Sequence, residues 1–157
     1  EGYFRMFRLA ELYLNYAEAA NEAVGPNTSV GTGSAMTAVD AVNAVRARVG
    51  MPAVSAQDAK SFRYRIRNER RVEFAFEALR FYDVRRWKEL DKTDRVVTGM
   101  RPVAQADNSY SYERYVVSQR NSYDDKFLRL PLPYSEVVKM YKHTGVDWQN
   151  PGWEGAE

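Results

Sequence analysis

The chain has 157 residues, of which 45% are hydrophobic, and it is long enough for one domain with a single core. It carries 23 Lys and Arg and 21 Asp and Glu, interleaved along the sequence. This argues against a nucleic-acid-binding surface, because such a surface needs clustered cations. There is no cysteine, which excludes disulfides and thiolate metal sites, and we expect neither a metal nor a cofactor. No apolar run is long enough to span a membrane.

Two helices are predicted at the start of the chain. The first spans 4–24 and ends at Gly25, before a proline. Its apolar stripe consists of Leu9, Leu12, Tyr13, Tyr16, Ala20 and Ala23. The second is capped by Ser34 or Thr37 and ends at Gly50. Its buried face consists of Ala35, Ala38, Val39, Val42, Val45 and Val49. We expect these two helices to form an antiparallel pair.

Residues 55–90 predict one long helix that begins near Ala59 and kinks between Leu79 and Asp83. A stripe of charged side chains runs along it, with large apolar residues on both sides. We therefore expect a mostly buried network of ion pairs formed by Glu69, Glu73, Glu77, Arg80, Asp83 and Arg86. Trp87, near the end of this helix, is expected to be a structural anchor in the core.

The rest of the chain changes character. Residues 91–126 form a polar loop region in which the alternation over 112–117 predicts a β-hairpin. A short strand is predicted at 127–132, followed by a helix that opens at Tyr134 and ends before Gly145. We expect a turn at 150–153 to pack back on the helical core and to bury most of Trp153, a second structural anchor.

Tyrosines in the polar region are the best ligand candidates, because carbohydrates present flat C–H faces that stack on aromatic rings. They are Tyr110, Tyr112, Tyr115 and Tyr123, with Asn108 and Arg120 as hydrogen-bonding neighbours. The alternative is that these rings only pack the loop against the helices.

The acidic residues Glu69, Glu73 and Glu77 could instead be a carboxylate pair of a glycoside hydrolase, since neighbours at i and i+4 lie about 5–6 Å apart. All three point from one helix face, however, and nearby basic residues would keep them ionised. Those basic residues are Arg70, Arg80 and Arg86. We therefore expect a structural network and no catalytic residue. The single histidine, His143, lies at a predicted helix end, where we expect it to interact favourably with the helix C-terminus rather than to take part in catalysis.

The segment Arg65–Trp87 reads R-I-R-N-E-R-R-V-E-F-A-F-E-A-L-R-F-Y-D-V-R-R-W. It resembles the signature helix of the SusD/RagB family, which are cell-surface nutrient-binding lipoproteins of Bacteroidota. Four other segments, at 8–23, 38–50, 128–137 and 149–153, resemble further elements of the family and stand in the family's order.

This resemblance implies a mostly α-helical fold of tetratricopeptide-like helix pairs with a small β element. It also implies that residues 1–157 are a single C-terminal domain of a longer protein. That domain comprises a helix pair at 1–50, the long helix at 55–90, the hairpin region at 91–126, and a strand, short helix and turn at 127–157.

The resemblance further implies a function without catalysis. Such a protein captures an oligosaccharide, or in some members a peptide, and passes it to a SusC-like TonB-dependent transporter, for which it acts as a lid. It is held on the outer face of the outer membrane by a lipid anchor that this chain does not contain. Two alternatives remain: a helical-repeat scaffold that contacts the transporter without a ligand site, and a glycoside hydrolase.

Overall fold

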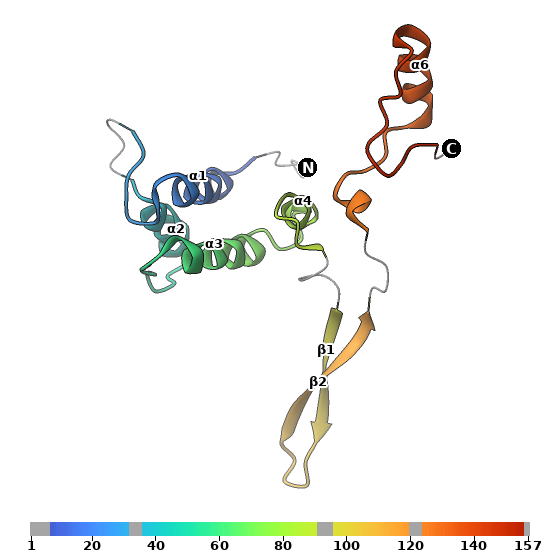
Figure 1. Ribbon diagram of the computed structural model, residues 1–157. Coiled ribbons are helices and arrows are strands. Elements are labelled where there is room, and N and C mark those ends of the chain that lie inside the picture. Colours follow the sequence, from blue (N-terminus) through green and yellow to red (C-terminus); the bar gives the residue numbers. More distant parts are fainter. Residues whose placement is uncertain (1–6, 32–35, 91–95, 120–123, 156–157) are drawn as a thin grey trace, which may run out of the picture. The chain divides into compact units, whose positions relative to one another are not determined.

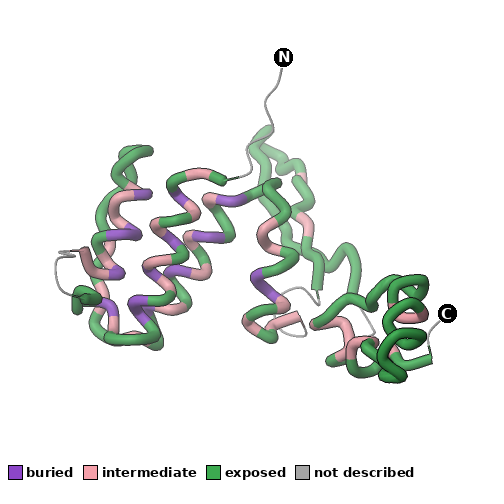
Figure 2. The backbone as a smooth tube through the Cα atoms, turned by 90° about the horizontal axis from the view of Figure 1, so that it is seen from above, coloured by how far each residue is buried: buried purple, intermediate pink, exposed green. Residues whose placement is uncertain are grey.

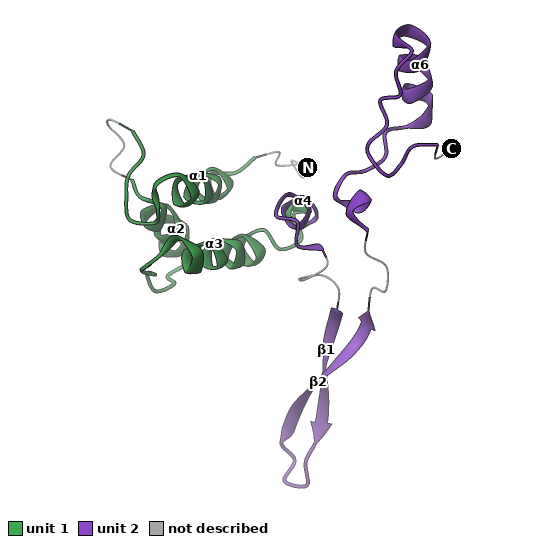
Figure 3. Cartoon of the chain, viewed as in Figure 1, with its two compact units in different colours: residues 1–80 green, residues 81–157 purple. Residues whose placement is uncertain are grey.

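The computed structural model of the protein describes residues 7–31, 36–90, 96–119 and 124–155. The chain divides into two compact units, Glu1–Arg80 and Phe81–Glu157 (Figure 3). Most of the regular structure is helical, and the described strands form one small two-stranded sheet (Figure 1). The predicted fold class, mostly α with a small β element, is confirmed.

The first unit is built from three described helices, α1 (Leu9–Val24), α2 (Ala38–Ala47) and α3 (Ala59–Glu73). Because α1 packs against both α2 and α3, it is the central helix of this unit. Buried positions recur along all three helices (Figure 2). The largest side chains of this core are Leu14, Val42, Phe62 and Ile66.

The predicted buried faces of the first two helices are correct only in part. Leu9 and Leu12, which were expected in the α1 stripe, are exposed, whereas Leu14 and Ala17 are fully buried. Small residues let neighbouring helices approach closely, so the face of α1 that meets α2 and α3 is rich in alanine rather than in large apolar groups. Val49 is exposed because α2 ends at Ala47, before the predicted end.

The starts of α2 and α3 follow local capping signals. Thr37 caps α2 in a capping box, in which its hydroxyl accepts from the Asp40 N–H at 3.1 Å and the Asp40 carboxylate accepts from the Thr37 N–H at 2.9 Å. Asp58 caps α3, and its carboxylate accepts from the Ser61 N–H at 2.9 Å. Both caps therefore satisfy backbone donors that the first helical turn leaves unpaired. The alternative cap, Ser34, lies outside the described residues.

We expect Thr37→Ala to lower the free energy of unfolding by about 1 kcal/mol, because the α2 cap is lost. The Thr37 hydroxyl, with its N–H, holds the pKa of Asp40 below its usual value, so this part of the cap is lost as the pH falls through that lowered pKa. In the variant the Asp40 pKa should rise toward its usual value, which NMR titration would detect. Thr28→Ala, at an exposed loop position, is the control and should change stability by less than about 0.5 kcal/mol in urea unfolding. Equal effects of the two changes would contradict the capping role.

The prediction of one long helix over 59–90 is wrong. α3 ends at Glu73, and α4 (Leu79–Arg86) begins only after an irregular turn. Within this turn Phe76 and Ala78 have φ angles of +66° and +62°, in the left-handed region that a right-handed helix excludes. Neither glycine nor proline marks the break, so local sequence signals did not place it.

The second unit contains most of α4, from Phe81 on, together with a β-hairpin and a C-terminal segment. Strands β1 (Val96–Ala104) and β2 (Tyr110–Gln119) pair antiparallel, with a register shift between Val97 and Thr98. The hairpin predicted around 112–117 is confirmed and is considerably longer than expected. Most of its residues are exposed on both faces, so the described part of the unit does not cover it.

The short strand predicted at 127–132 is wrong. The Asp124 carboxylate accepts from the Lys126 N–H at 2.9 Å and starts a 3-10 helix, η1 (Asp125–Leu128). Beyond η1 the backbone is extended, but side-chain amides replace a partner strand: Gln149 both accepts from the Leu132 N–H (2.8 Å) and donates to the Leu132 carbonyl (3.0 Å). The last helix, α6 (Tyr134–Thr144), ends as predicted at Gly145, which is left-handed with φ of +69°.

Trp153 anchors the terminal turn, but on the C-terminal segment itself. Its indole N–H donates to the Lys126 and Arg129 carbonyls at 3.0 and 3.1 Å, and its ring meets Phe127 edge-on at 5.7 Å. It is half-buried rather than largely buried, and these contacts lie within the second unit instead of the helical core. The expected position of this anchor is therefore corrected.

Candidate functional site

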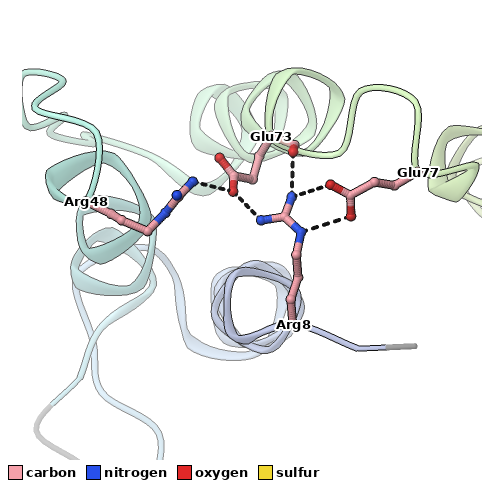
Figure 4. Close-up of polar contacts among 4 residues, drawn as sticks. All are labelled: Arg8, Arg48, Glu73 and Glu77. Carbon is pink, nitrogen blue, oxygen red and sulfur yellow. Dashed lines mark hydrogen bonds and ion pairs between the residues drawn. The ribbon is translucent and has the colours of Figure 1, made fainter. Parts of the chain in front are cut away.

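Charged residues of the predicted stripe meet arginines from distant parts of the first unit. Arg8, the residue just before α1, donates to both carboxylate oxygens of Glu77 at 2.9 and 2.7 Å, and to the Glu73 carboxylate at 2.5 Å (Figure 4). Arg48 donates to the same Glu73 oxygen at 2.8 Å. The Arg8 guanidinium also lies 4.9 Å from the centre of the Phe74 ring. We call this group the Arg8 clamp: Arg8, Arg48, Glu73 and Glu77.

The Arg8 clamp fixes the irregular turn after α3. Arg8 donates to the backbone carbonyl of Glu73 at 2.5 Å, where the helix ends, and to the carboxylate of Glu77 within the turn. Hydrogen bonds to Glu77, and then to Glu73, raise the pKa of Arg8 above its usual value against the effect of burial. Arg8 therefore ties the end of α3 to Glu77, the residue between the strained positions Phe76 and Ala78.

The remaining members of the predicted stripe lie elsewhere. Glu69 accepts from Arg46 of α2 at 2.8 Å, with both side chains mostly buried. Asp83 is buried on α4 and accepts from Arg86 of the same helix at 2.8 Å. Arg80 lies on α4 and is the last residue of the first unit.

The predicted single stripe is thus divided between two helices. Glu69, Glu73 and Glu77 pair with Arg8, Arg46 and Arg48, which the sequence analysis did not name. Arg70 donates to the Asn15 side chain of α1 at 2.6 Å. The chain separation of 65–69 residues between Arg8 and its acids explains why no local pattern pointed to it.

The geometry of these acids suits a structural role in ion pairs better than a catalytic role in glycoside hydrolysis. A glycosidase needs two carboxyl groups that approach the scissile bond, whereas Glu69 and Glu73 are both engaged by guanidinium groups of their own unit. Among the residues that the structure describes, no group of three His, Asp or Glu side chains is placed to hold a metal ion. His143 lies in the last turn of α6.

The candidate tyrosines fall on different faces of the hairpin. Tyr110 and Tyr112 pair with Ala104 and Pro102, so both rings project from one face, where they are 63% and 66% exposed. Tyr115 pairs with Gly99 and projects from the other face. We call the first of these the tyrosine face of the hairpin.

Tyr115 has the contacts of a packing residue. A Cβ on Gly99 would lie 3.1 Å from its ring and 2.9 Å from Val117, so the ring covers a position that only glycine leaves open. The Arg101 guanidinium lies 4.9 Å from the ring centre.

The other predicted ligand residues are not brought to the tyrosine face as a set. Asn108 lies in the hairpin loop with φ of +64°, and its N–H donates to the Gln105 carbonyl at 3.1 Å, which is a turn-forming role. Tyr123 and Arg120 lie outside the described residues. Trp87 is half-buried after α4, with the Arg86 guanidinium 5.2 Å from its ring.

A groove that the sequence analysis missed lies within the second unit. It has a volume of about 1010 Å³ and runs between α4, the η1 segment and the turn at Pro151 and Gly152. Its basic residues are Arg85, Arg86, Lys88, Lys126 and Arg129. Its apolar residues include Phe81, Tyr82, Leu128 and Leu130. The run R-R-W-K at the end of α4 was a sequence signal for it, but the partners from 124–130 could not be foreseen.

Comparison with known proteins places the chain in a family. The sequence model of the SusD family matches residues 1–153. The crystal structure of a SusD-like protein from Bacteroides fragilis is 38% identical over 91% of this chain, with a TM-score of 0.68. The chain covers 24% of that protein. No curated protein matched. The described elements and these matches show a SusD-like, mostly helical fold, and the chain belongs to the SusD family.

In residues 7–31, 36–90, 96–119 and 124–155, none of the helices is long and apolar enough to cross a membrane.

Proposed function

We propose that the protein is a non-catalytic, cell-surface component of a SusD-type uptake system and that it binds an oligosaccharide. Membership of the family supports the nutrient-binding role in general, because SusD-like proteins are generally binding proteins rather than enzymes. The 24% of the Bacteroides fragilis protein that the chain covers supports the further proposal that these residues form one domain of a longer protein.

The observation that best supports oligosaccharide binding is the tyrosine face of the hairpin. Tyr110 and Tyr112 are neighbours on one side of β2 and are mostly exposed, while Pro102 and Ala104 opposite them add apolar surface. Rings buried in a core cannot meet a ligand, whereas adjacent exposed rings offer a platform for the C–H faces of successive sugars. Their hydroxyl groups can hydrogen-bond to sugar hydroxyls.

The proposed partner is a SusC-like TonB-dependent transporter, for which the whole protein acts as a lid. The proposed location is the outer face of the outer membrane, through a lipid anchor in the whole protein. Both proposals rest on family membership, since SusD-like proteins in general are cell-surface associated and have such a partner.

We expect the double change Tyr110→Ala and Tyr112→Ala to weaken oligosaccharide binding by the whole protein about 10-fold or more, since each aromatic contact contributes roughly 0.5–1.5 kcal/mol. Isothermal titration against a panel of oligosaccharides measures this. The matched control is Tyr134→Ala with Tyr141→Ala, which removes two equally exposed tyrosines from α6. It should leave binding unchanged.

The same titrations separate the alternatives. Unchanged affinity in the hairpin variant would remove the tyrosine face from the site. Absence of glycan binding, with retained binding to the transporter, would favour the scaffold alternative, and binding of peptides alone would identify the nutrient as a peptide. Shorter sugars among the products would reveal a glycoside hydrolase.

A further inference from the structure

The groove of the second unit is more basic than its surroundings. Residues 81–157 contain equal numbers of basic and acidic side chains, yet five basic and only two acidic side chains line the groove. The two acids are Asp124, whose carboxylate already caps η1, and Asp125. Arg86 is paired with Asp83. The excess of positive charge is thus local to this groove.

Among the described residues, two of the cations are not engaged by acidic side chains. Lys88 and Arg129 are exposed, and neither belongs to an ion pair of the described residues. A third, Lys126, is positioned by aromatic groups, with its ammonium 4.8 Å from the Trp153 ring and 5.6 Å from the Phe127 ring. These cations surround the groove from two different segments of the chain.

The backbone at Lys88 adds a second observation. Lys88 follows α4 with φ of +55°, and its N–H donates to the Arg85 carbonyl at 3.0 Å. This left-handed position after a helix favours glycine, so a lysine there is strained and is not what the turn itself requires. Strain of this kind concentrates at functional sites, and here it holds a cation at the rim of the groove.

Apolar surface lies beside these charges. Phe81 and Tyr82 are exposed on α4, with the Arg85 guanidinium 3.5 Å from the centre of the Phe81 ring, and Leu128 and Leu130 also line the groove. Flat apolar faces next to charge-assisted hydrogen-bond donors complement a sugar ring that carries an anionic group. A neutral sugar would offer Lys88 and Arg129 no anionic partner.

We propose that this groove binds the anionic group of an acidic saccharide, either the carboxylate of a uronic acid or a sulfate ester. The inference rests on the proposed function as a glycan-binding protein and adds the class of glycan. Lys88 and Arg129 contact the anion, and Phe81 and Tyr82 contact the ring.

The test compares charged and uncharged forms of one ligand. The whole protein is titrated with short oligogalacturonates and with their methyl esters, which keep the sugar but lose the charge. A sulfated oligosaccharide and its desulfated form provide the second arm, and neutral oligosaccharides provide the third. We expect one acidic ligand to bind about 10-fold more tightly than its uncharged form and to weaken as salt is raised.

Two variants locate the site. Lys88→Gly should lower the affinity for the acidic ligand about 2- to 5-fold while leaving the melting temperature unchanged or higher, since glycine suits the backbone there. Arg129→Gln should lower it to a similar extent. Lys142→Gln, which removes an equal charge from the last turn of α6, should leave it unchanged.

The outcomes distinguish this inference from the proposed function. Neutral and acidic sugars that bind equally well would overturn the inference and leave the proposed function intact. Tight acidic binding that neither Lys88→Gly nor Arg129→Gln weakens would overturn the groove as its site. If none of these saccharides binds to the protein, both proposals are overturned.

Discussion

Glu73→Ala is expected to lower the free energy of unfolding by about 3 kcal/mol, because it removes the acid shared by two arginines. The Glu73 side chain is 11% exposed, and its carboxylate accepts from Arg8 and Arg48. Arg8 is itself mostly buried, with 24% of its side chain exposed, so the change would leave a partly desolvated cation with Glu77 as its remaining acid. The turn that carries Phe76 and Ala78 would also lose one of its supports.

The control for this prediction is an ion pair of the same kind at the surface. Glu136 accepts from Lys139 on α6 at 2.6 Å, with both side chains more than half exposed. Glu136→Ala should cost less than about 1 kcal/mol and should matter less still in high salt. Urea unfolding at two salt concentrations measures both changes. A loss below about 1 kcal/mol for Glu73→Ala would show that the ion pairs of the Arg8 clamp contribute no more to stability than solvent-exposed pairs do.

Elements with a local signal could be predicted from the sequence. The α2 start at Thr37 and the α3 start at Asp58 follow from caps whose hydrogen bonds span only three residues. The end of α6 follows from Gly145, which takes the left-handed conformation that stops a helix. The hairpin follows from alternation along β2.

Features that depend on distant partners could not be predicted. The break after α3 has no glycine or proline, and it is stabilised by Arg8, which lies 65 residues away from Glu73. The extended segment near Leu132 was read as a strand, because nothing in its own sequence shows that Gln149 would supply the hydrogen bonds of a partner strand.

For the candidate site, the sequence predicted suitable residue types but not how the fold would arrange them. Tyrosines suited to sugars were identified, and alternation along β2 places Tyr110 and Tyr112 on one face and Tyr115 on the other. The register that sets Tyr115 opposite Gly99 could not be foreseen. The basic groove needed two segments about 40 residues apart to meet, which no periodicity in the sequence signals.

Phe62→Ala should have the largest effect on stability, with an expected loss of about 3–5 kcal/mol. Phe62 lies on α3 in the core between the three helices of the first unit and is only 2% exposed. Its neighbours there include Leu14 and Val42, and alanines bring the helix backbones close together. Such a core cannot collapse around a missing ring, so the change would leave a cavity in addition to the lost burial.

Phe76→Ala is the matched control, because it deletes the same ring at a fully exposed position of the same unit. No cavity forms there, so we expect a change of less than about 0.5 kcal/mol. Phe62→Leu, which keeps most of the volume, should cost less than about 1.5 kcal/mol and remain folded, so that the series can be read even if Phe62→Ala unfolds. Thermal and urea unfolding of the three variants measure the differences. Similar losses for Phe62→Ala and Phe76→Ala would mean that Phe62 does not fill the core between α1, α2 and α3.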